Sequence, residues 1–412
     1  MIDQLMWSSL RQQAFRWLFF STLVSLIGSK IQRVALLFVA YQETQNAVWV
    51  SLILGAQFVA KAALGPLLGP LVDRYDRKTL MILSNLIRGF LVACIPLFAI
   101  GSMPLLMLLA FLMAVFESIY YSASNSAVPD LVSKSQLDSA NSLLTFVDRF
   151  ADVSFVALAG VLVAGVGPAP AFWIDAVSYI TAAVFLMFLP ALPGRAGKGN
   201  YFAAVAEGLR PLWQNPILRR TVGTLALAAA FGSVEATLGI VYAIGALKIG
   251  VQGFGVLEAL MAAGAILGAI ITPSLISRLS REIVFLLGLG TFGLFLASLG
   301  LFPFPLWAGV AMVAMGLLNT MFIVPARSII QTTAPTELRG RIMATFGSTM
   351  QSAVLFGTFL AGVLEPRLGV LTVLVLSGSI VFLTVLSVYL RGGIPAPSYH
   401  TKADLTDMRL VG

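Results

Sequence analysis

Ionisable side chains stand inside long apolar stretches of this sequence. A charge at the centre of a bilayer costs at least about 2.5–3.5 kcal/mol on insertion scales, so such residues usually face a partner or a wet cavity and serve a function. The chemistry open to them is proton exchange or the binding of a charged substrate group. The candidates for these two roles are Glu235, Asp148, Asp152, Glu117, Arg149, Lys30, Arg33 and Lys61.

Spacing places three of these residues close together on one helix. Asp148 and Asp152 are four positions apart and Arg149 and Asp152 are three apart, so each pair can meet on a helical surface. If Arg149 pairs with Asp152, then Asp148 must either be protonated or find a cation on another helix. The cations available elsewhere are Lys30, Arg33 and Lys61. A carboxylate that alternates between pairing and protonation is what proton coupling requires.

Glu235 is the clearest single candidate for a proton carrier. No Lys or Arg lies within one helical turn of it, whereas Gly232, Gly239 and Tyr242 are close in the sequence. A carboxyl group in this position can be neutral in one state of the protein and ionised in another, and it can then carry a proton or bind a cationic group. The alternative for each of these acids is a static salt bridge between helices.

Four other charged residues are interpreted as structural. Glu258 is expected near the membrane surface, in a static ion pair. Asp175 lies about a turn and a half inside its apolar stretch, close enough to water to need no special role. Arg88 and Arg327 stand near the ends of their stretches, where a long basic side chain can extend to the headgroups.

Several classes of chemistry are disfavoured by residues that the sequence lacks. It contains one cysteine, Cys94, and one histidine, His400, so a disulfide framework is excluded and a Cys/His metal site or a Ser-His-Asp triad is disfavoured. The glycine-rich segment 194–199 lacks the spacing of a phosphate-binding loop. The sequence therefore predicts no enzyme, metal or cofactor, and a proton gradient in place of ATP as the energy source.

The elements that must position these groups are membrane-spanning helices. Of the 412 residues 58% are apolar and only 11% are charged, far from the soluble norm of about 45–50% and 25%. A helix needs about 20 apolar residues per crossing. Apolar stretches bounded by charge, Gly and Pro predict an all-α polytopic membrane protein with twelve spans. They are placed near 17–41, 48–72, 79–100, 103–126, 138–166, 169–190, 220–246, 252–277, 283–302, 305–331, 342–364 and 369–390.

The distribution of Lys and Arg predicts the orientation of the spans. Most of the 26 basic residues fall in loops on the side that holds both termini, and only Lys248 and Arg367 fall in loops on the other side. Cytoplasmic loops hold the positive excess, so both termini are expected in the cytoplasm and the chain in the inner membrane. The net charge of +8 then reflects topology and attraction to anionic lipid, and no nucleic-acid partner is predicted.

The sequence divides into two halves that resemble each other. Landmarks recur about 200 residues apart: Gly65, Pro70 and Arg74 have rough counterparts in Gly268, Pro273 and Arg278. Repeated six-span units are typical of secondary transporters, in which two bundles move about a central site. The predicted units are a six-helix bundle over 1–190, a cytoplasmic linker with a surface helix over 191–219, a second bundle over 220–391 and a cytoplasmic tail over 392–412.

The loop between the second and third spans carries a distinctive motif, Gly-Pro-Leu-Val-Asp-Arg-Tyr-Asp-Arg-Lys over 69–78. Small residues allow another helix to approach closely. Asp73 can accept hydrogen bonds at a helix start or pair with an Arg. The basic residues are expected to hold the turn at the headgroups. The predicted conformational-gate residues are Gly69, Asp73, Arg74, Arg77 and Lys78.

This motif resembles the G-x-L-x-D-R-x-x-R-K signature of the major facilitator superfamily. With Asp76 in place of a common Gly, it looks most like the branch of macrolide-efflux and enterobactin exporters, as do segments 128–142 and 335–341. The sequence departs from that branch at Gly28-Ser29-Lys30, where an acid is often found, and in the fifth span, which lacks a Gly-Pro-rich antiporter motif.

The resemblance implies two pseudo-symmetric six-helix bundles, the major facilitator fold, and export coupled to proton entry. We therefore expect a monomeric secondary transporter that exports an amphipathic organic compound, drug or siderophore-like, by proton antiport. One alternative on the same fold is a translocator of lipid or lysophospholipid. Another, suggested by the two departures from the branch, is a membrane sensor that transports nothing.

Overall fold

The computed structural model describes residues 8–61, 74–133, 136–194, 201–335 and 338–394. In these ranges the chain is helical and contains no strand. In the described ranges eleven helices are long and apolar enough to cross a membrane, and Ala47–Val59 is a shorter apolar helix. The all-α, twelve-helix membrane fold predicted from the sequence is thus confirmed.

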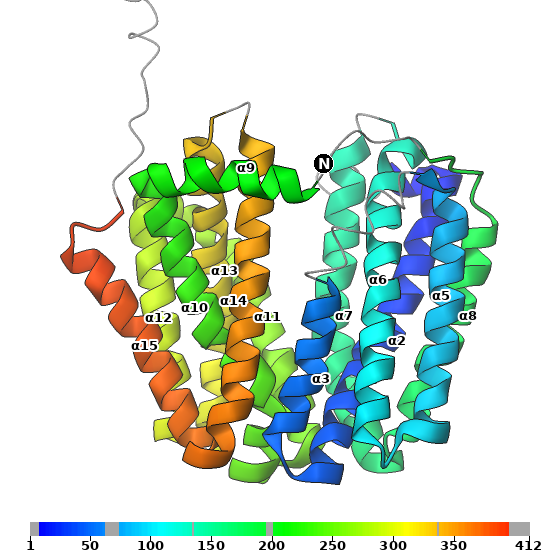
Figure 1. Ribbon diagram of the computed structural model, residues 1–412, viewed down its shortest axis with the longest axis horizontal. Helices are drawn as coiled ribbons and strands as arrows, with labels where there is room; N and C mark the ends of the chain where they lie inside the picture. The colour runs from blue at the N-terminus through cyan, green and yellow to red at the C-terminus, as the bar shows by residue number, and fades with distance from the viewer. Residues whose placement is uncertain (1–7, 62–73, 134–135, 195–200, 336–337, 395–412) are drawn as a thin grey trace, which may run out of the picture.

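Two bundles stand side by side, with one helix across the end of the second (Figure 1). The first bundle contains η1 (Ser8–Arg11), α2 (Gln13–Thr44), α3 (Ala47–Val59), α5 (Arg77–Cys94), the π-helical turn η3 (Ile95–Ala99), α6 (Met103–Leu131), α7 (Leu137–Val166) and α8 (Ala169–Met187). The second contains α10 (Pro216–Val241), the π-helical turn η5 (Tyr242–Ala246), α11 (Gly250–Arg278), α12 (Arg281–Leu301), α13 (Pro305–Thr333), α14 (Arg339–Leu368) and α15 (Val370–Leu390).

Some of the helices begin at a capping side chain. The side chain of Asn46 accepts a hydrogen bond from the Val48 amide at the start of α3, and that of Asn215 accepts from the amides of Ile217 and Leu218 at the start of α10. A side-chain oxygen at this position satisfies amides that have no partner within the helix. In the hydrocarbon core the remaining backbone groups must pair within each helix, which is why only helices are used here.

The packing of the two bundles repeats with an offset of six spans. In the first bundle α2 packs against α7 and α8, and α5 against α6 and α8. In the second, α10 packs against α14 and α15, and α12 against α13 and α15. The pair α3 and α6 likewise corresponds to α11 and α13. These matching contacts give the two bundles the pseudo-symmetry expected from the sequence.

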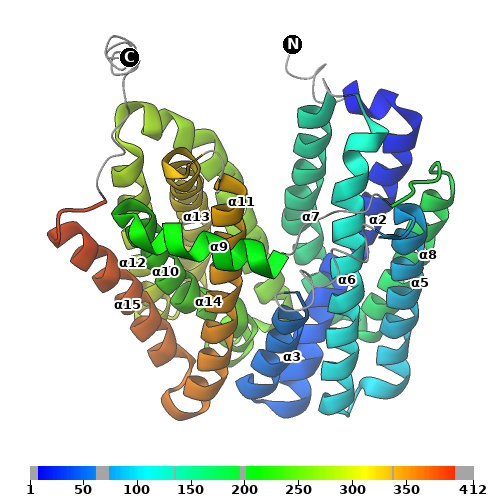
Figure 2. The same ribbon diagram turned by 45° about the horizontal axis from the view of Figure 1, so that its top comes forward.

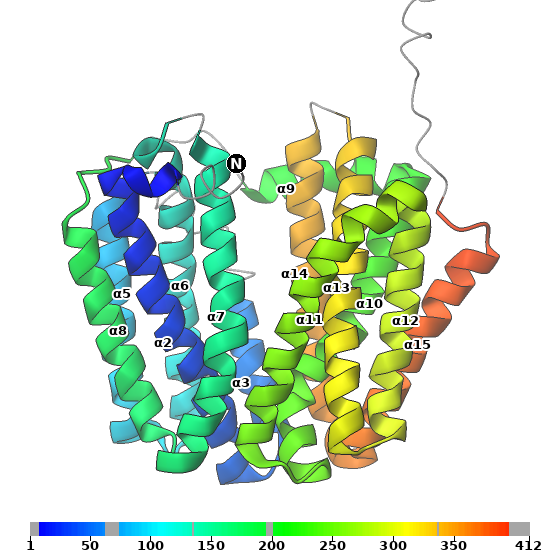
Figure 3. The ribbon, with the colours of Figure 1, turned by 180° about the vertical axis from the view of Figure 1, so that it is seen from behind.

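The bundles contact each other at the end far from α9 (Tyr201–Gln214) and stand apart toward the α9 end (Figures 1 and 3). The contacts are symmetric, α7 against α11 and α3 against α14. At Gly160 of α7 an added Cβ would lie 2.7 Å from the Val251 carbonyl oxygen and 3.1 Å from the Gly255 Cα atom. Two glycines facing each other therefore allow the backbones of α7 and α11 to touch.

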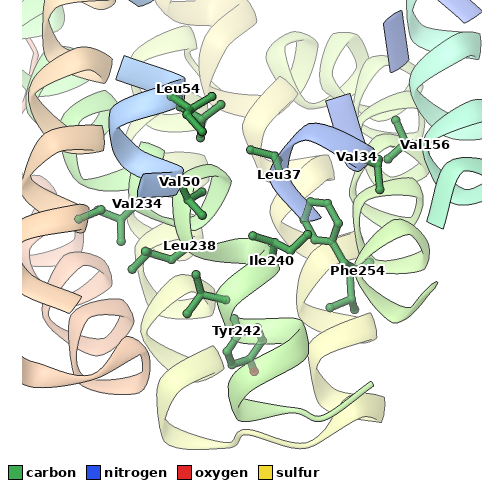
Figure 4. Packing of buried hydrophobic residues seen from close by; sticks show 14 of the residues in the cluster. Val34, Leu37, Val50, Leu54, Val156, Val234, Leu238, Ile240, Tyr242 and Phe254 are labelled. Carbon is green, nitrogen blue, oxygen red and sulfur yellow. The ribbon is translucent and has the colours of Figure 1, made fainter. Parts of the chain in front are cut away.

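Apolar side chains from both bundles fill this junction. Val34, Val50 and Val156 come from the first bundle, and Leu238 and Phe254 from the second (Figure 4). All five are buried. Burying an aliphatic or aromatic side chain contributes about 1.5–3 kcal/mol relative to exposure in water, so the junction is a packed seam.

Helix α9 lies across one end of the second bundle (Figure 2). Gly208 sits against the Arg341 backbone of α14, and Glu207 forms an ion pair of 2.7 Å with the Arg341 guanidinium. Trp213 and Leu209 on the same helix are exposed. An amphipathic helix with exposed apolar residues at the end of a membrane bundle is suited to the headgroup region.

Candidate functional site

Lys30 of α2 joins two carboxylates of α7. Its Nζ atom lies 3.0 Å from Asp148 Oδ1 and 2.7 Å from Asp152 Oδ1. The sequence allowed Lys30, Arg33 or Lys61 as the partner of Asp148, and in the structure that partner is Lys30. The side chain of Arg149 lies outside what the structure describes. Because Asp148 is still 41% exposed, this cluster stands at the boundary between packed protein and open space.

A second ion pair links α3 and α6. Lys61 Nζ lies 2.9 Å from Glu117 Oε2, and both side chains are about two-fifths exposed. Glu117 also lies within electrostatic range of Lys30 and Arg88. The cations Lys30 and Lys61 are thus each neutralised by acids of their own bundle, so neither is free to receive an anionic substrate in this conformation.

A third ion pair crosses between the bundles. Arg33 Nη2 on α2 lies 3.7 Å from Glu258 Oε2 on α11, at the long end of ion-pair distances. An ion pair was expected for Glu258, and Arg33 is its partner; the packing of α11 against the first bundle leaves the Glu258 side chain only 16% exposed. Separating the bundles here would break this pair.

Glu235 of α10 is buried, with 3% of its surface exposed. Among the described residues no hydrogen-bond partner reaches its Oε1 atom. Gly239 and Phe254 lie beside it, since a Cβ atom at Gly239 would be 3.5 Å from Glu235 Oε1 and 3.2 Å from the Phe254 ring. The charges that act on Glu235 are those of Glu258 and Arg33. Glu235 is therefore an enclosed carboxyl group next to the ion pair that joins the bundles.

The role of Lys30 gives a stability prediction. Lys30→Met removes the cation shared by Asp148 and Asp152, and breaking a buried ion pair costs about 3–5 kcal/mol. Since Asp148 is partly exposed, we expect a smaller loss of about 1–3 kcal/mol, seen as a lower midpoint of thermal unfolding in detergent. The triple variant with Asp148→Asn and Asp152→Asn should recover most of it. An unchanged midpoint, equal to that of the exposed-site control Lys248→Met, would contradict this role.

A buried polar cluster in the first bundle was missed by sequence reasoning. Arg88 does not extend to the headgroups: it is buried, donates a hydrogen bond to the Tyr179 hydroxyl, and has its guanidinium carbon 4.2 Å from the centre of that ring. The Tyr179 hydroxyl lies 2.9 Å from Ser29 Oγ. Asp175 is fully buried, not close to water, and its Oδ1 atom accepts from Ser178 Oγ at 3.2 Å.

The packing of α8 explains both corrections. Gly28 of α2 and Gly89 of α5 face α8, and neither has a side chain to hold it away. Asp175, Ser178 and Tyr179 therefore point into the bundle. Their spacing of three and four residues on one helical face was the signal that could have found this cluster.

The predicted gate loop is only partly covered by the structure. Gly69 and Asp73 lie outside the described residues, and Arg74 is exposed. Arg77, which was expected to hold the turn at the headgroups, has a buried side chain, 2.6 Å from Asp130 Oδ2 and 2.6 Å from the Ser126 carbonyl oxygen. The end of α6 packs against the start of α5 and supplies both acceptors.

The neighbours of Arg77 fasten the start of α5 to the end of α8. Lys78 Nζ donates to the carbonyls of Met187 and Leu189, which lie at a helix C-terminus and attract a cation. Burial alone would raise the pKa of Asp76, but hydrogen bonds from Thr79 and from the Leu192 amide, together with the Lys78 charge, hold that pKa below its ordinary value. Together with those of Arg77, these contacts tie the start of α5 to the ends of α6 and α8.

The ionic groups converge at one level of the molecule. Lys30, Asp148 and Glu117 lie near the middle of their helices, Lys61 pairs with Glu117 just past the end of α3, and Glu235 lies slightly nearer the junction of the bundles. In the described ranges no group of three or more His, Cys, Asp or Glu side chains is placed to hold a metal ion. Carboxyl groups and bases in this arrangement can exchange protons, and they can change ion-pair partners when the bundles move.

Comparisons with known proteins place this geometry in context. A sequence model of the Major Facilitator Superfamily matches residues 18–358. The multidrug efflux pump Tap of Mycolicibacterium fortuitum is 27% identical, over 90% of this chain and 94% of its own. The enterobactin exporter EntS of Salmonella typhi is 28% identical, over 80% of each chain.

A solved structure with the same fold is that of a bacterial homologue of the iron transporter ferroportin in an inward-facing state. It superposes with a TM-score of 0.74 at 16% identity, covering 91% of this chain and 98% of that one. At this level of identity the likeness concerns the fold alone.

Proposed function

Because the chain belongs to the major facilitator superfamily, we propose that it exports an amphipathic organic compound from the cytoplasm in exchange for protons. The observation that carries this proposal is Glu235, an enclosed carboxyl group beside the ion pair between the bundles. The efflux pump and the siderophore exporter among its relatives support the export of drug-like or siderophore-like compounds. Both termini, and with them the α9 end, would lie in the cytoplasm of an inner-membrane protein.

The proposed cycle follows from the arrangement of the bundles. In this structure they contact each other at the end far from α9 and their helices stand apart toward the α9 end (Figure 1). In the opposite state the far end separates, and the Arg33–Glu258 pair must break. Glu235 then gains contact with water and exchanges its proton. Alternation of the two states around a fixed central site is how transporters with two repeated bundles move a substrate.

The balance of charge favours a cationic or neutral substrate over an anionic one. Among the candidate residues of the sequence, together with Glu258, the bases Lys30, Arg33, Lys61 and Arg149 are outnumbered by the acids Asp148, Asp152, Glu117, Glu235 and Glu258. Three of those bases already contact acids. A cationic amphiphile would find an acid in surplus, whereas a catecholate or a lysophospholipid would need one of the bases to be released.

Proteoliposomes with an imposed pH gradient test this proposal. We expect an external cationic amphiphile such as ethidium to change proton flux through the protein, measured with an enclosed pH-sensitive dye, and to leave empty liposomes unaffected. Flux that responds only to lysophosphatidylglycerol would assign lipid translocation, and flux that responds only to a tricatecholate would assign siderophore export. No response to any of the three would favour a sensor and contradict the proposal.

A further inference from the structure

A groove of about 520 Å³ lies on the outer side of the second bundle, between α10 and α15 at the α9 end. Helix α15 tilts away from α10 toward this end (Figures 1 and 3), which separates the two helices and opens the groove. It lies away from the junction of the bundles, so it does not belong to the candidate site for transport.

The lining of the groove changes from basic to apolar along the two helices. At its outer end are the arginines Arg219, Arg220 and Arg391. About one turn further inside lie Thr224 of α10 and Ser387 and Val388 of α15. Toward the inner end follow Leu227 of α10 and Thr384, Leu383 and Ile380 of α15. The residues Arg220, Thr224 and Leu227 on α10, like Arg391, Ser387, Leu383 and Ile380 on α15, are three or four positions apart, so each set shares one face.

The three arginines have no carboxylate partner among the described residues. Arg220 donates to the Gly393 carbonyl oxygen at 2.7 Å, and Arg219 lies 3.5 Å from that of Trp213. No acidic side chain lines the groove in these ranges. Three cations in one groove repel one another unless an anion lies between them, and arginine is well suited to bind phosphate with two hydrogen bonds.

The position of the groove fits the border between headgroups and acyl chains. Leu227 and Leu383 are exposed on the outside of the bundle, where they would contact lipid. Trp213 and Tyr389, near the two ends of the basic rim, are also exposed. Trp and Tyr are enriched at the level of the headgroups in membrane proteins.

We propose that this groove binds an anionic phospholipid, with the phosphate among the three arginines and an acyl chain along Leu227, Ile380 and Leu383. Basic side chains at the outer end, mixed hydroxyl and apolar side chains in the middle and apolar side chains at the inner end match the phosphate, glycerol ester and hydrocarbon of such a lipid. A free phosphate ion would use the arginines alone and would leave the apolar half of the groove without a role.

Native mass spectrometry of the full-length protein, titrated with phosphatidylglycerol and with phosphatidylcholine, tests the proposal. We expect half-saturation at a phosphatidylglycerol concentration at least about tenfold lower than the phosphatidylcholine concentration. Each basic residue near a lipid surface contributes about 1 kcal/mol, roughly a fivefold effect. The variant Arg219→Gln/Arg220→Gln/Arg391→Gln should therefore lose this preference. Millimolar inorganic phosphate should not displace phosphatidylglycerol, and displacement would overturn lipid binding in favour of a free-phosphate site.

Two matched variants control for the loss of positive charge as such and for misfolding. Arg11→Gln/Arg16→Gln/Arg278→Gln removes the same charge from exposed residues at the same end and should keep the preference within about twofold. The corresponding triple Lys variant of the groove keeps the charge and should retain a clear preference for phosphatidylglycerol, which excludes misfolding as the cause of loss. Equal loss in the control, or no loss in the Gln variant of the groove, would overturn the proposal.

Discussion

The Glu235→Gln variant is expected to lose substrate-driven proton flux in proteoliposomes, to less than a tenth of the wild-type rate. Gln has nearly the same shape as a protonated Glu but cannot release a proton. The variant therefore mimics the protonated state permanently, whereas the proposed cycle needs both the protonated and the ionised state. Exchange of labelled substrate across the membrane at equal pH on both sides requires no net movement of protons. That exchange should persist, and the contrast separates loss of coupling from loss of folding or of substrate binding.

An exposed carboxylate offers the control for this experiment. Glu43 lies at the end of α2, away from the charged cluster, and Glu43→Gln should leave proton flux within about twofold of the wild type. Glu258→Gln should give an intermediate loss, because it removes the acid that pairs with Arg33 but leaves Glu235 in place. Full substrate-driven flux in Glu235→Gln would remove Glu235 from the proposed mechanism.

Sequence patterns predicted the fold well because a bilayer restricts what a chain can do. Stretches of about 20 apolar residues can only be helices there. The repeat of landmarks such as Pro70 and Pro273 then pointed to two matching bundles. The candidate charges could be recognised for the same reason, since an ionisable residue such as Glu235 stands out against apolar neighbours.

The partners of those charges could not be predicted from the sequence. A pattern along one helix shows which residues share a face, but not which neighbouring helix that face meets. Lys30 was one of three possible cations for Asp148, and only the contact of α2 with α7 selects it. Asp175 and Arg88 were assigned to water and headgroups from their distance along the span. In the structure the faces of α8 and α5 that carry Asp175 and Arg88 point into the bundle, so both side chains are buried.

Replacing Gly160, at the junction of the bundles, with Val is expected to have a large effect on conformation. Val in place of Gly160 would push against the Val251 carbonyl and Gly255, so α7 and α11 could no longer touch. Overpacking of this kind costs about 1–3 kcal/mol, which lowers the population of the far-end-closed state by roughly 5- to 150-fold. We expect the far end to open and transport to fall, because the variant returns to the closed state only rarely.

A single introduced cysteine can report this opening. Cys94, the one native cysteine, is first replaced by Ala. Ser51→Cys then places a thiol at the buried contact of α3 with Gly362 of α14, at the same end of the molecule. A membrane-impermeant maleimide should label it at least about tenfold faster when Gly160 is Val.

The control for the Gly160→Val variant lies on the same helix. Gly165 has open space where its Cβ would be, so Gly165→Val adds the same bulk to α7 without touching α11 and should leave the rate of labelling unchanged. Because the two variants share the helix and the chemical change, a difference between them isolates the contact between the bundles. Equal labelling in both would mean that closure at this end does not depend on the approach of α7 to α11, and the alternation proposed for transport would then need another hinge.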